Sequence, residues 1–469
     1  MKILLVSPCR DLAARRSKFL MIPQLALHLL AGLTPPEHEV KIVEEEIEDI
    51  NFDEECDLVG ISCMTANAPR AYRFAQEFRK RGKKVVLGGI HPTILPDEAL
   101  QHADSVVIGE AEGVWEQLLE DAKNGRLQKK YYKAYPSLDR YVQIRSRRES
   151  KKRVFDIIPV MTTRGCPFKC DFCCVYNIFG PVIRHIPVKN VIQDIVDSEG
   201  KNILFLDDNV VGDPGYAKEL FTALKPLGIK WAGQASMSLA RNPGLMRLAV
   251  ESGCRALFFG LESVSKTQLL KMRKSAKSVE KTEEEIKKIR DSGIYFHPSL
   301  IFGFDDDTKD IFPETLEFLE RNRISSASLN ILTPYPGTKV YNQFLNEGRL
   351  ITLDWKYYNH STVVFKPRHM EPLELQAGRL WTLAEFVKIS SILKRLPFNL
   401  DYPIYHLVVN IGTWWVYRDD LRTFPRLAYD LFPISREDLD KKYRIRPWTL
   451  KIHDLIPHNW IKTQSEVMG

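Results

Sequence analysis

The chain has 469 residues, a formal net charge of +7, 44% hydrophobic residues and 27% charged residues. This length allows two or three domains, and the ordinary composition excludes a low-complexity protein. No apolar run approaches the roughly 20 residues of a membrane-spanning helix, and the start, MKILLVSP, lacks the layout of a signal peptide. Eight cysteines in so long a chain are no disulfide framework, so we expect a cytoplasmic protein.

The positive charge is concentrated in one segment. Residues 129–153 hold ten lysines and arginines against Asp139 and Glu149, so this segment carries +8 and the rest of the chain about −1. Such a stripe suits phosphate groups or a membrane surface, and the alternative is a solvated linker. We see no nucleic-acid motif and expect no nucleic-acid partner.

The first 125 residues alternate between strand-like and helical patterns. The apolar runs lie at 2–8, 40–47, 57–62, 84–89 and 105–110, and the helical patterns between them at 23–33, 68–82 and 113–125. This alternation predicts a Rossmann-like α/β domain, with a parallel sheet covered by helices on both faces. Ligands of such sheets bind beyond the carboxyl ends of the strands.

A second alternating series follows the basic linker at 126–156. Its expected strands are 157–163, 202–208, 229–236, 255–263, 295–303 and 327–333, with a helical pattern after each of the first five. Six repeats are too few for an eight-fold barrel. We therefore predict an incomplete (β/α)6 barrel over residues 157–345, with its chemistry at the carboxyl ends of the strands.

The pattern changes after residue 345. Residues 371–396 read as one amphipathic helix, and a tail rich in aromatic residues follows. We predict a mostly helical C-terminal domain over 346–469, and we expect it to determine substrate specificity. Its tryptophans would suit a large apolar substrate or a membrane surface, and the alternative is that they form the core of the domain. These tryptophans are Trp381, Trp414, Trp415, Trp448 and Trp460.

Three cysteines carry the clearest chemical signal. Cys166, Cys170 and Cys173 have the spacing C-x3-C-x2-C within TTRGCPFKCDFCC, directly after the first strand of the expected barrel. Three thiolates so spaced can hold three irons of a [4Fe–4S] cluster, which leaves the fourth iron open for another ligand. The alternative is zinc with a fourth ligand from elsewhere. We expect the adjacent Cys174 to be structural.

The cysteine motif and its barrel resemble the radical S-adenosylmethionine superfamily. The resemblance extends to an aromatic residue before the last cysteine, to FLDDN (205–209), to QASMS (234–238) and to GLES (260–263). IFGFDDDT (301–308) and TPYPGTKVY (333–341) are also similar to stretches found in one branch of the superfamily. The positions that the resemblance implies for S-adenosylmethionine are Phe172, Asp207, Asp208, Gln234, Ser236 and Glu262.

Residues 1–125 are similar to the cobalamin-binding domain of that branch. The similarity rests on ISCMT (61–65), LGGIHPT (87–93) and IGEAEG (108–113). The implied cobalamin-binding residues are Ser62, Thr65, Gly88, Gly89, His91, Pro92, Thr93, Gly109 and Glu110. Alternatively, Glu110 and Glu112 cap the helix that begins near Gly113. We expect His91 to be a hydrogen-bonding residue beside the cofactor and not a cobalt ligand.

Two details leave the cofactor set open. The loop after the first strand carries Asp11 without the histidine of a D-x-H-x-x-G motif, so the domain could also keep its fold without binding cobalamin. Cys9 and Cys63 resemble the second-cluster cysteines of methylthiotransferases. The third such cysteine is missing, because Gly88, Gly89 and His91 occupy that region. We therefore do not expect a second cluster.

The resemblance implies the cofactors and the reaction. We expect a [4Fe–4S] cluster, S-adenosylmethionine and cobalamin, with two molecules of S-adenosylmethionine used for each radical methylation of an unactivated carbon. The alternatives are a non-methylating radical reaction, such as ring formation or carbon–carbon coupling, and a cobalamin-binding sensor or carrier. The expected partners are an apolar small molecule such as a lipid, terpenoid or tetrapyrrole, and an electron donor such as flavodoxin or ferredoxin. Peripheral membrane contact is a further expectation.

Overall fold

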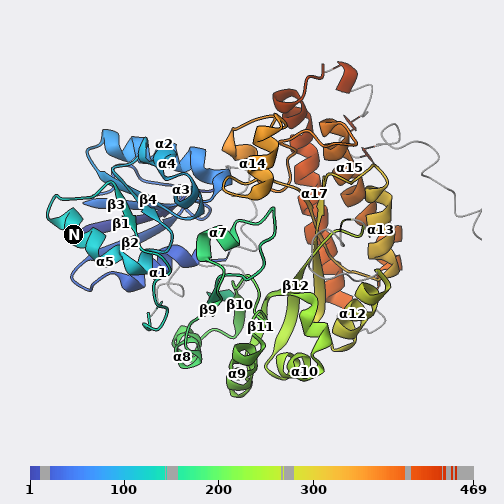
Figure 1. The fold of residues 1–469 in the computed structure, drawn as a ribbon, viewed down its shortest axis with the longest axis horizontal. Helices are drawn as coiled ribbons and strands as arrows, with labels where there is room; N and C mark the ends of the chain where they lie inside the picture. Colours follow the sequence, from blue (N-terminus) through green and yellow to red (C-terminus); the bar gives the residue numbers. More distant parts are fainter. Residues whose placement is uncertain are drawn as a thin grey trace, which may run out of the picture. The chain divides into compact units, whose positions relative to one another are not determined.

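The computed structural model forms two compact units (Figure 1). It describes residues 1–10, 22–142, 144, 157–265, 268, 279–396, 403–435, 437–439, 445–446 and 449–450. Unit 1 comprises Met1–Ala256, Tyr335–Asn342 and Asp354–Asn359, and unit 2 comprises Leu257–Pro334, Gln343–Leu353 and His360–Gly469. The domain boundaries expected at 125, 156 and 345 stay a prediction. Asp11, Trp448, Trp460 and most of the basic residues of 129–153 lie outside the described residues.

The N-terminal sheet belongs to unit 1 and is parallel throughout, in the order β2-β1-β3-β4-β5-β6. Its strands are β1 (Lys2–Ser7), β2 (Glu39–Glu44), β3 (Leu58–Ser62), β4 (Lys84–Gly88), β5 (Ser105–Ile108) and β6 (Lys130–Tyr132). The helices are α1 (Leu25–Leu33), α2 (Ala68–Lys80), α3 (Ile90–Ile94), α4 (Pro96–Leu100) and α5 (Trp115–Lys123). The first five strands confirm the predicted sheet, whereas β6 arises within the expected linker.

Strand β3 shows why both faces of this sheet are covered. Successive side chains of a strand point to opposite faces, so Val59 and Ile61 join one core, and Leu58 joins the other. The first core is completed by α2 through side chains such as Phe78, and the second by α1 and α5. Because both faces are buried, the strands are apolar along most of their length, as in other parallel sheets.

The second sheet has the order β14-β13-β12-β11-β10-β7, which confirms the predicted partial barrel of six strands. Its strands are β7 (Ile157–Val160), β10 (Asn202–Phe205), β11 (Lys230–Ala235), β12 (Cys254–Glu262), β13 (Tyr295–Phe302) and β14 (Ser328–Ile331). The helices between them are α8 (Val188–Ser198), α9 (Pro214–Leu224), α10 (Pro243–Glu251), α12 (Val279–Asp291) and α13 (Ile311–Arg321).

The segment after β7 forms a small structure of its own. Strands β8 (Thr163–Arg164) and β9 (Arg184–His185) pair antiparallel, and the chain between them contains helix α7 (Val175–Phe179). Short 3-10 turns in other loops span Thr65–Asn67, Ala111–Gly113, Lys225–Leu227, Met237–Arg241 and Trp355–Tyr357. The β8–β9 pair closes the loop that carries the three motif cysteines.

Helices dominate the chain after β14. They are α14 (Lys339–Asn346), α15 (Pro372–Phe386), α16 (Ile389–Lys394) and α17 (Pro403–Leu431), followed by the short strands β15 (Ile445–Arg446) and β16 (Thr449–Leu450). The single helix expected over 371–396 is wrong, because Lys388 is extended and separates α15 from α16. The break lets Arg395 turn back and donate to the Phe386 carbonyl oxygen (2.5 Å). Among the described residues, no helix is long and apolar enough to cross a membrane.

Candidate functional site

The cysteine loop is held closed at its base. Gly165 has φ +98°, and a Cβ at this position would collide with the Val182 carbonyl oxygen, so only glycine fits. Within the loop the amide of Cys166 donates to the Gly180 carbonyl oxygen (3.3 Å), and the amide of Cys173 donates to that of Cys170 (3.1 Å). Cys166, Cys170 and Cys173 are all half-buried. All three thiols are therefore partly accessible, on a loop whose two ends are fixed.

Burial sets the protonation state of the last cysteine. It raises the pKa of the Cys173 thiol to about 12, and the neighbouring Cys174, Cys170 and Asp208 add to the shift. Because iron binds the thiolate, loading this site must release a proton. Among the described residues no three His, Cys, Asp or Glu side chains gather around one point for a single metal ion. The spacing of the three cysteines nevertheless suits three irons of a cluster, each of which takes one thiolate.

Asp207 links the second barrel strand to the segment before the cysteines. Its carboxylate is fully buried and accepts hydrogen bonds from the hydroxyl groups of Thr162 (2.7 Å) and Thr163 (2.6 Å) and from both backbone amides. Burial raises the pKa of Asp207. Since both threonines precede the loop directly, Asp207 anchors the start of the cysteine loop to the end of β10.

The Asp208 side chain, next in the chain, is accessible to solvent at a surface crowded by protein atoms. Desolvation by the surrounding protein, helped by the charge of Asp207, raises the pKa of Asp208 to about 6. The following residue, Asn209, accepts from the amide of Ser236 (3.0 Å) and donates to its hydroxyl (3.3 Å). Asn209 thus braces one expected binding residue, while Gln234 is exposed. Asn209 was missed, although its place in FLDDN was a signal.

The other two expected contacts of S-adenosylmethionine lie in separate units. Phe172 is half-buried in the cysteine loop of unit 1. Glu262 ends strand β12 in unit 2, where it is buried and has φ +68°, a left-handed conformation that is uncommon for glutamate. Such backbone outliers concentrate at functional sites. The roles of all these residues remain proposals.

His91 lies in a buried polar network at the end of β4. Its ring is fully buried and lies between the Thr65 hydroxyl (3.3 Å) and Glu98 (3.2 Å). Glu98 also accepts hydrogen bonds from Tyr72 (3.0 Å) and Trp355 (2.9 Å). Burial alone would raise the pKa of Glu98, but these hydrogen bonds outweigh it and lower that pKa. Both nitrogens of His91 are engaged, which agrees with the expected hydrogen-bonding role.

Glycines shape the neighbouring strand ends. Gly89 has φ +99°, and a Cβ there would lie 2.6 Å from the Cys63 carbonyl oxygen. Gly109 has φ +78°, and a Cβ there would meet open space. The Thr93 hydroxyl joins these two loops, since it donates to the Gly89 carbonyl oxygen (2.7 Å) and accepts from the Gly109 amide (2.9 Å). A bulky ligand can therefore approach the backbone at Gly109, which fits the cobalamin expectation.

The remaining cobalamin-binding candidates surround these loops. Ser62 and Gly88 are half-buried at the ends of β3 and β4, and Pro92 is buried in α3. Cys9 and Cys63 are buried, and burial raises the pKa of the Cys63 thiol. The described structure places no third cysteine beside them at Gly88 or Gly89.

Glu110 joins the N-terminal sheet to the base of the cysteine loop. Its two carboxylate oxygens lie 2.5 Å from Arg164 in β8 and 2.6 Å from Arg184 in β9. Glu112 forms a second ion pair with Arg164. Glu110 makes no side-chain cap at the turn that begins after it. The capping alternative for Glu110 is therefore wrong, because both oxygens are committed to arginines in this structure.

The segment TPYPGTKVY returns to unit 1 and contacts the same loops. Lys339 pairs with Asp171 of the cysteine loop (3.1 Å), and Asn177 of α7 donates to the Gly337 carbonyl oxygen (2.6 Å). A Cβ on Gly337 would lie 2.9 Å from Ile94 of α3. The segment therefore lies between the cysteine loop and α3. The loops expected to hold the cluster and cobalamin are thus neighbours.

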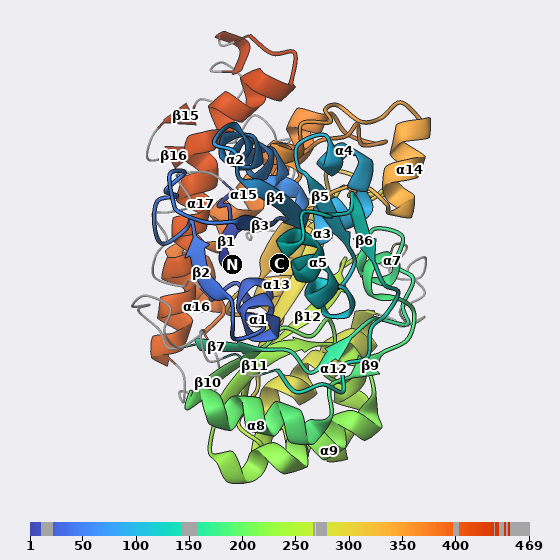
Figure 2. The ribbon, with the colours of Figure 1, turned by 90° about the vertical axis from the view of Figure 1, so that its left-hand side faces the viewer.

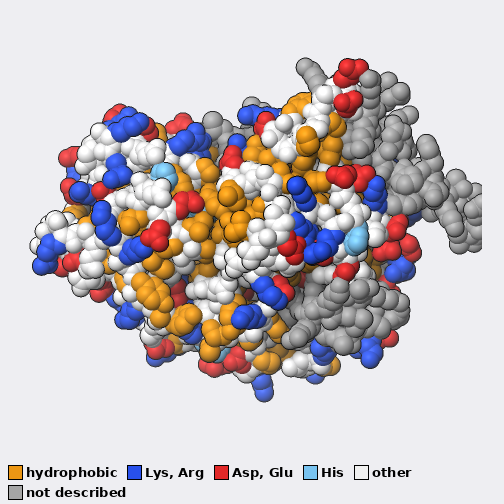
Figure 3. All heavy atoms as spheres, turned by 45° about the horizontal axis from the view of Figure 1, so that its top comes forward, with side chains coloured by type: hydrophobic (Ala, Val, Ile, Leu, Met, Phe, Trp, Pro, Cys, Tyr) orange, Lys and Arg blue, Asp and Glu red, His pale blue; other side chains and the backbone are white. Residues whose placement is uncertain are grey.

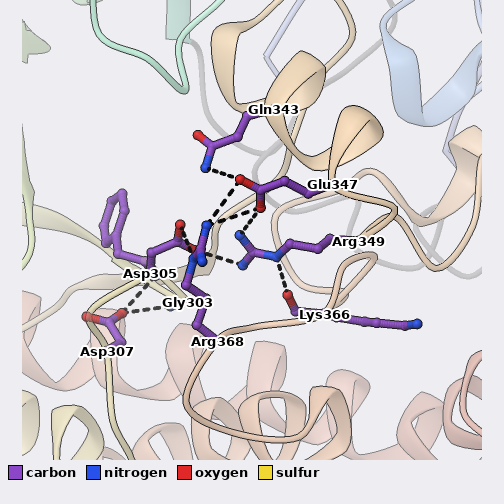
Figure 4. Close-up of polar contacts among 9 residues, drawn as sticks. Gly303, Asp305, Asp307, Gln343, Glu347, Arg349, Lys366 and Arg368 are labelled. Atoms are coloured by element: carbon purple, nitrogen blue, oxygen red, sulfur yellow. Dashed lines mark hydrogen bonds and ion pairs between the residues drawn. The ribbon is translucent and has the colours of Figure 1, made fainter.

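The segment IFGFDDDT lies in unit 2 and organises an ion-pair network (Figure 4). Asp305 accepts from Arg349 (2.7 Å) and Arg368 (2.8 Å), and both arginines also bind Glu347. Asp307 accepts from the Gly303 amide (2.8 Å) and has one buried oxygen without a hydrogen-bond partner in the described structure. Burial raises the pKa of Asp307 to about 7. These contacts give the motif a structural role in the loop after β13.

Comparisons with known proteins give two domain matches. Residues 160–319 match the model of the radical SAM superfamily, and residues 23–119 match the model of the B12 binding domain. The first match covers the cysteine loop and β7–β13 down to α13. The second covers the loops that carry His91 and Gly109.

Two curated relatives and one solved structure resemble most of the chain. The bacteriochlorophyllide d C-8(2)-methyltransferase of Chlorobaculum tepidum is 34% identical over 83% of this chain and 90% of that protein. The C-12(1)-methyltransferase of the same organism is 32% identical over 72% of this chain and 76% of that protein. The methyltransferase TsrM of Kitasatospora setae, solved with tryptophan substrate and a SAM analog, has a TM-score of 0.65 over 92% of this chain and 99% of that one, at 14% identity. This last likeness shows the fold alone.

Proposed function

The chain belongs to the cobalamin-dependent radical S-adenosylmethionine methyltransferases, and we propose that it methylates an unactivated carbon on a tetrapyrrole-like substrate. It is a C-methylating enzyme whose cofactors are a [4Fe–4S] cluster, S-adenosylmethionine and cobalamin. The observation that carries the substrate proposal is the 34% identity to a bacteriochlorophyllide methyltransferase over nine-tenths of its length. The non-methylating alternative is not favoured, because both bacteriochlorophyllide-modifying relatives described above are methyltransferases.

The chain's own residues divide the work of holding the cofactors. We assign the cluster to Cys166, Cys170 and Cys173, and the ammonium group of S-adenosylmethionine to the accessible carboxylate of Asp208. When bound, the cluster and S-adenosylmethionine would supply a carbon-centred radical, and cobalamin would supply a transferable methyl group. The protein would orient and shield both. Asp207 acts on this site by anchoring the loop through Thr162 and Thr163.

We propose further binding residues for S-adenosylmethionine in the cysteine loop and at the ends of two barrel strands. We assign the adenine ring to Phe172 in the cysteine loop, and we assign further contacts to Gln234, Ser236 and Glu262 at the ends of the third and fourth barrel strands. On the cobalamin side, the open backbone at Gly109 leaves room for a flat macrocycle, and the buried His91 network supports the neighbouring loop from within. Glu110 holds the two arginines of β8 and β9 and is assigned a positioning role.

We also assign two exposed apolar side chains to contacts with the apolar substrate. Met64, after β3, is 56% exposed, and Phe168, in the cysteine loop, is 47% exposed. The substrate is a small molecule. A one-electron donor such as flavodoxin or ferredoxin completes the proposed set of partners, because the cluster must be reduced from outside the chain.

Anaerobic turnover with labelled S-adenosylmethionine tests the substrate proposal. The full-length protein is reconstituted with iron, sulfide and hydroxocobalamin, so that every transferred methyl group comes from S-adenosylmethionine. It is then reduced and offered a bacteriochlorophyllide or a pentacyclic terpenoid in separate reactions with trideuteromethyl S-adenosylmethionine. We expect 5′-deoxyadenosine in both and a trideuteromethyl group only on the tetrapyrrole. Methylation of the terpenoid alone would overturn the substrate class. Formation of 5′-deoxyadenosine with a tetrapyrrole product that lacks the added methyl group would overturn methylation.

A further inference from the structure

Helix α17 (Pro403–Leu431) has polar side chains on its inner side. Asn410 is 2% exposed, accepts from Arg395 (2.8 Å) and donates to the Ser325 carbonyl oxygen (3.1 Å). Further along the helix, Asp420 pairs with Arg379 of α15 (2.7 Å). These directional contacts lie on one side of the helix and prevent it from rolling within unit 2. The side that faces outward is therefore a fixed feature of the fold.

The outward side of the first half of α17 is apolar. Leu407, Val408, Ile411, Trp414 and Trp415 recur at helical spacing and are 53%, 55%, 57%, 39% and 56% exposed. A helix of a soluble domain normally turns its apolar side inward and its polar side outward. Helix α17 does the reverse over these turns. A contiguous exposed apolar surface of this kind marks an interaction site.

Arginines continue this surface along the same side of the helix. Ile411, Trp415, Arg418, Arg422 and Arg426 follow one another at three- and four-residue steps. The Arg418 guanidinium lies over both Trp414 (5.4 Å) and Trp415 (5.3 Å). Arg422 is exposed, and the Arg426 side chain is 89% exposed. The acidic groups on the solvent side are Asp419 and Asp430, of which Asp430 lies 3.7 Å from Arg426.

Helix α16 adds to the apolar surface at the start of α17. Ile389 is 76% exposed and Leu393 is 59% exposed. The His406 ring lies 3.3 Å from the Ile392 carbonyl oxygen, so α16 packs beside the first turns of α17. Figure 2 labels α16 beside α17, in agreement with this contact. The face of the molecule drawn in Figure 3 mixes charges of both signs among apolar patches.

We propose that the α17 surface, defined as Leu407, Val408, Ile411, Trp414, Trp415, Arg418, Arg422 and Arg426, docks on an anionic lipid bilayer. Apolar residues followed by arginines match the order of acyl chains and phosphate groups, and tryptophan favours the boundary between them. The helix would lie on the membrane, tilted so that its first half enters the headgroup boundary and the arginines contact phosphates. This proposal goes beyond methyl transfer and does not depend on it.

Vesicle flotation tests the proposal with the full-length, cluster-loaded protein. The probes are vesicles of phosphatidylglycerol and phosphatidylcholine, compared with phosphatidylcholine alone. The double variant I411S/W415S should reduce binding by at least tenfold. R422Q/R426Q should weaken binding to the anionic vesicles by on the order of fivefold for each arginine and reduce its salt dependence. The matched control is Leu353→Ser, which replaces a leucine that is 53% exposed elsewhere in unit 2.

Each result has a defined meaning. The control and the α17 variants should keep the wild-type thermal melt, because the replaced side chains face solvent. A variant that melts early is replaced by I411Q/W415Q.

Absence of binding to anionic vesicles at low salt would overturn the proposal. So would equal binding by I411S/W415S and the wild type. If the wild type forms a concentration-dependent dimer that I411S/W415S abolishes, a second copy covers the surface instead. 5′-Deoxyadenosine formation in detergent-free buffer is measured separately, so loss of membrane binding cannot be confused with loss of catalysis.

Discussion

A carboxylate oxygen of Glu110 lies 2.5 Å from a guanidinium nitrogen of Arg164, although the two residues are 54 positions apart. Both side chains are almost fully buried, and Arg184 occupies the second oxygen of Glu110. Arg164 immediately precedes Gly165 at the start of the cysteine loop. The N-terminal sheet and the base of the cluster loop are thus joined through charges that have little contact with water. Buried pairs of this kind add little to stability as pairs but are costly to break.

Replacing Glu110 tests this connection. E110Q leaves Arg164 and Arg184 with less compensating charge, so we expect the free energy of unfolding of the apo-protein to fall by about 3 kcal/mol. The same variant should retain less iron after reconstitution. The matched control is E116Q, which removes an exposed pair with Arg140 and should change stability by less than about 1 kcal/mol. Equal effects of the two substitutions, measured by urea denaturation, would contradict the positioning role.

Substitution of the two neighbouring aspartates should have different effects on stability and on ligand binding. D207N weakens the hydrogen bonds from Thr162 and Thr163 in a fully buried site, so we expect a lower melting temperature and poor cluster incorporation. D208N should keep the melting temperature and the iron content but bind S-adenosylmethionine about tenfold more weakly, by loss of a charge-assisted contact. Equilibrium binding to the reconstituted protein separates the two. Unchanged affinity in D208N would remove Asp208 from the binding site.

The cysteine loop contains four cysteines, three within the motif and one beside it, so their effects on the cluster can be compared. Alanine at Cys166, Cys170 or Cys173 should each abolish the cluster, because three thiolates are the minimum set for three irons. C174A should keep full iron and sulfide content, since Cys174 lies beside the motif and not within its spacing. Iron analysis and the electron paramagnetic resonance signal of the reduced protein provide the measurements. A C174A protein without a cluster would mean that the ligand set is wrong.

Asp307 should make stability depend on pH. Burial raises its pKa to about 7 in the folded protein, whereas the unfolded value is 3.8. The unfolded state therefore loses this proton first as pH rises, and the folded state loses about 2 kcal/mol of stability from this group between pH 5 and pH 7. D307N should lack this slope, while D310N, which removes an exposed carboxylate nearby, should keep it. Parallel slopes for D307N and wild type would show that Asp307 does not titrate in this range.

Both sheets could be predicted from the sequence because each buried strand is a short apolar run between helical patterns. The run KVVLGG, for example, became β4 and placed Gly88 and Gly89 at its carboxyl end. Strand β6 could not be predicted in this way, since KYY is a short segment in a basic region and pairs only along the edge of the sheet. The break in helix 371–396 could not be predicted, because the hydrogen bond from Arg395 to the Phe386 carbonyl oxygen forms only in the folded chain and leaves no periodic pattern.

The site was predictable where local motifs carry the chemistry and less so where partners are distant. The cysteine spacing and FLDDN identified the loop and the strand end that meets it. Sequence spacing does not show which of Asp207 and Asp208 anchors the loop and which is free to bind ligand, because this depends on which carboxylate accepts from Thr162. Glu110 was assigned to cobalamin or to a helix cap, whereas its partners Arg164 and Arg184 lie 54 and 74 positions away. Such ion pairs leave no periodic signal.

The ratio of products formed in single anaerobic turnovers tests the central claim most directly. Radical C-methylation through cobalamin requires one S-adenosylmethionine for the radical and one to restore the methyl group. We predict equal amounts of 5′-deoxyadenosine, S-adenosylhomocysteine and C-methylated tetrapyrrole, all absent in C170A. Formation of the methylated product without 5′-deoxyadenosine would contradict radical chemistry, and 5′-deoxyadenosine without S-adenosylhomocysteine would contradict methyl transfer.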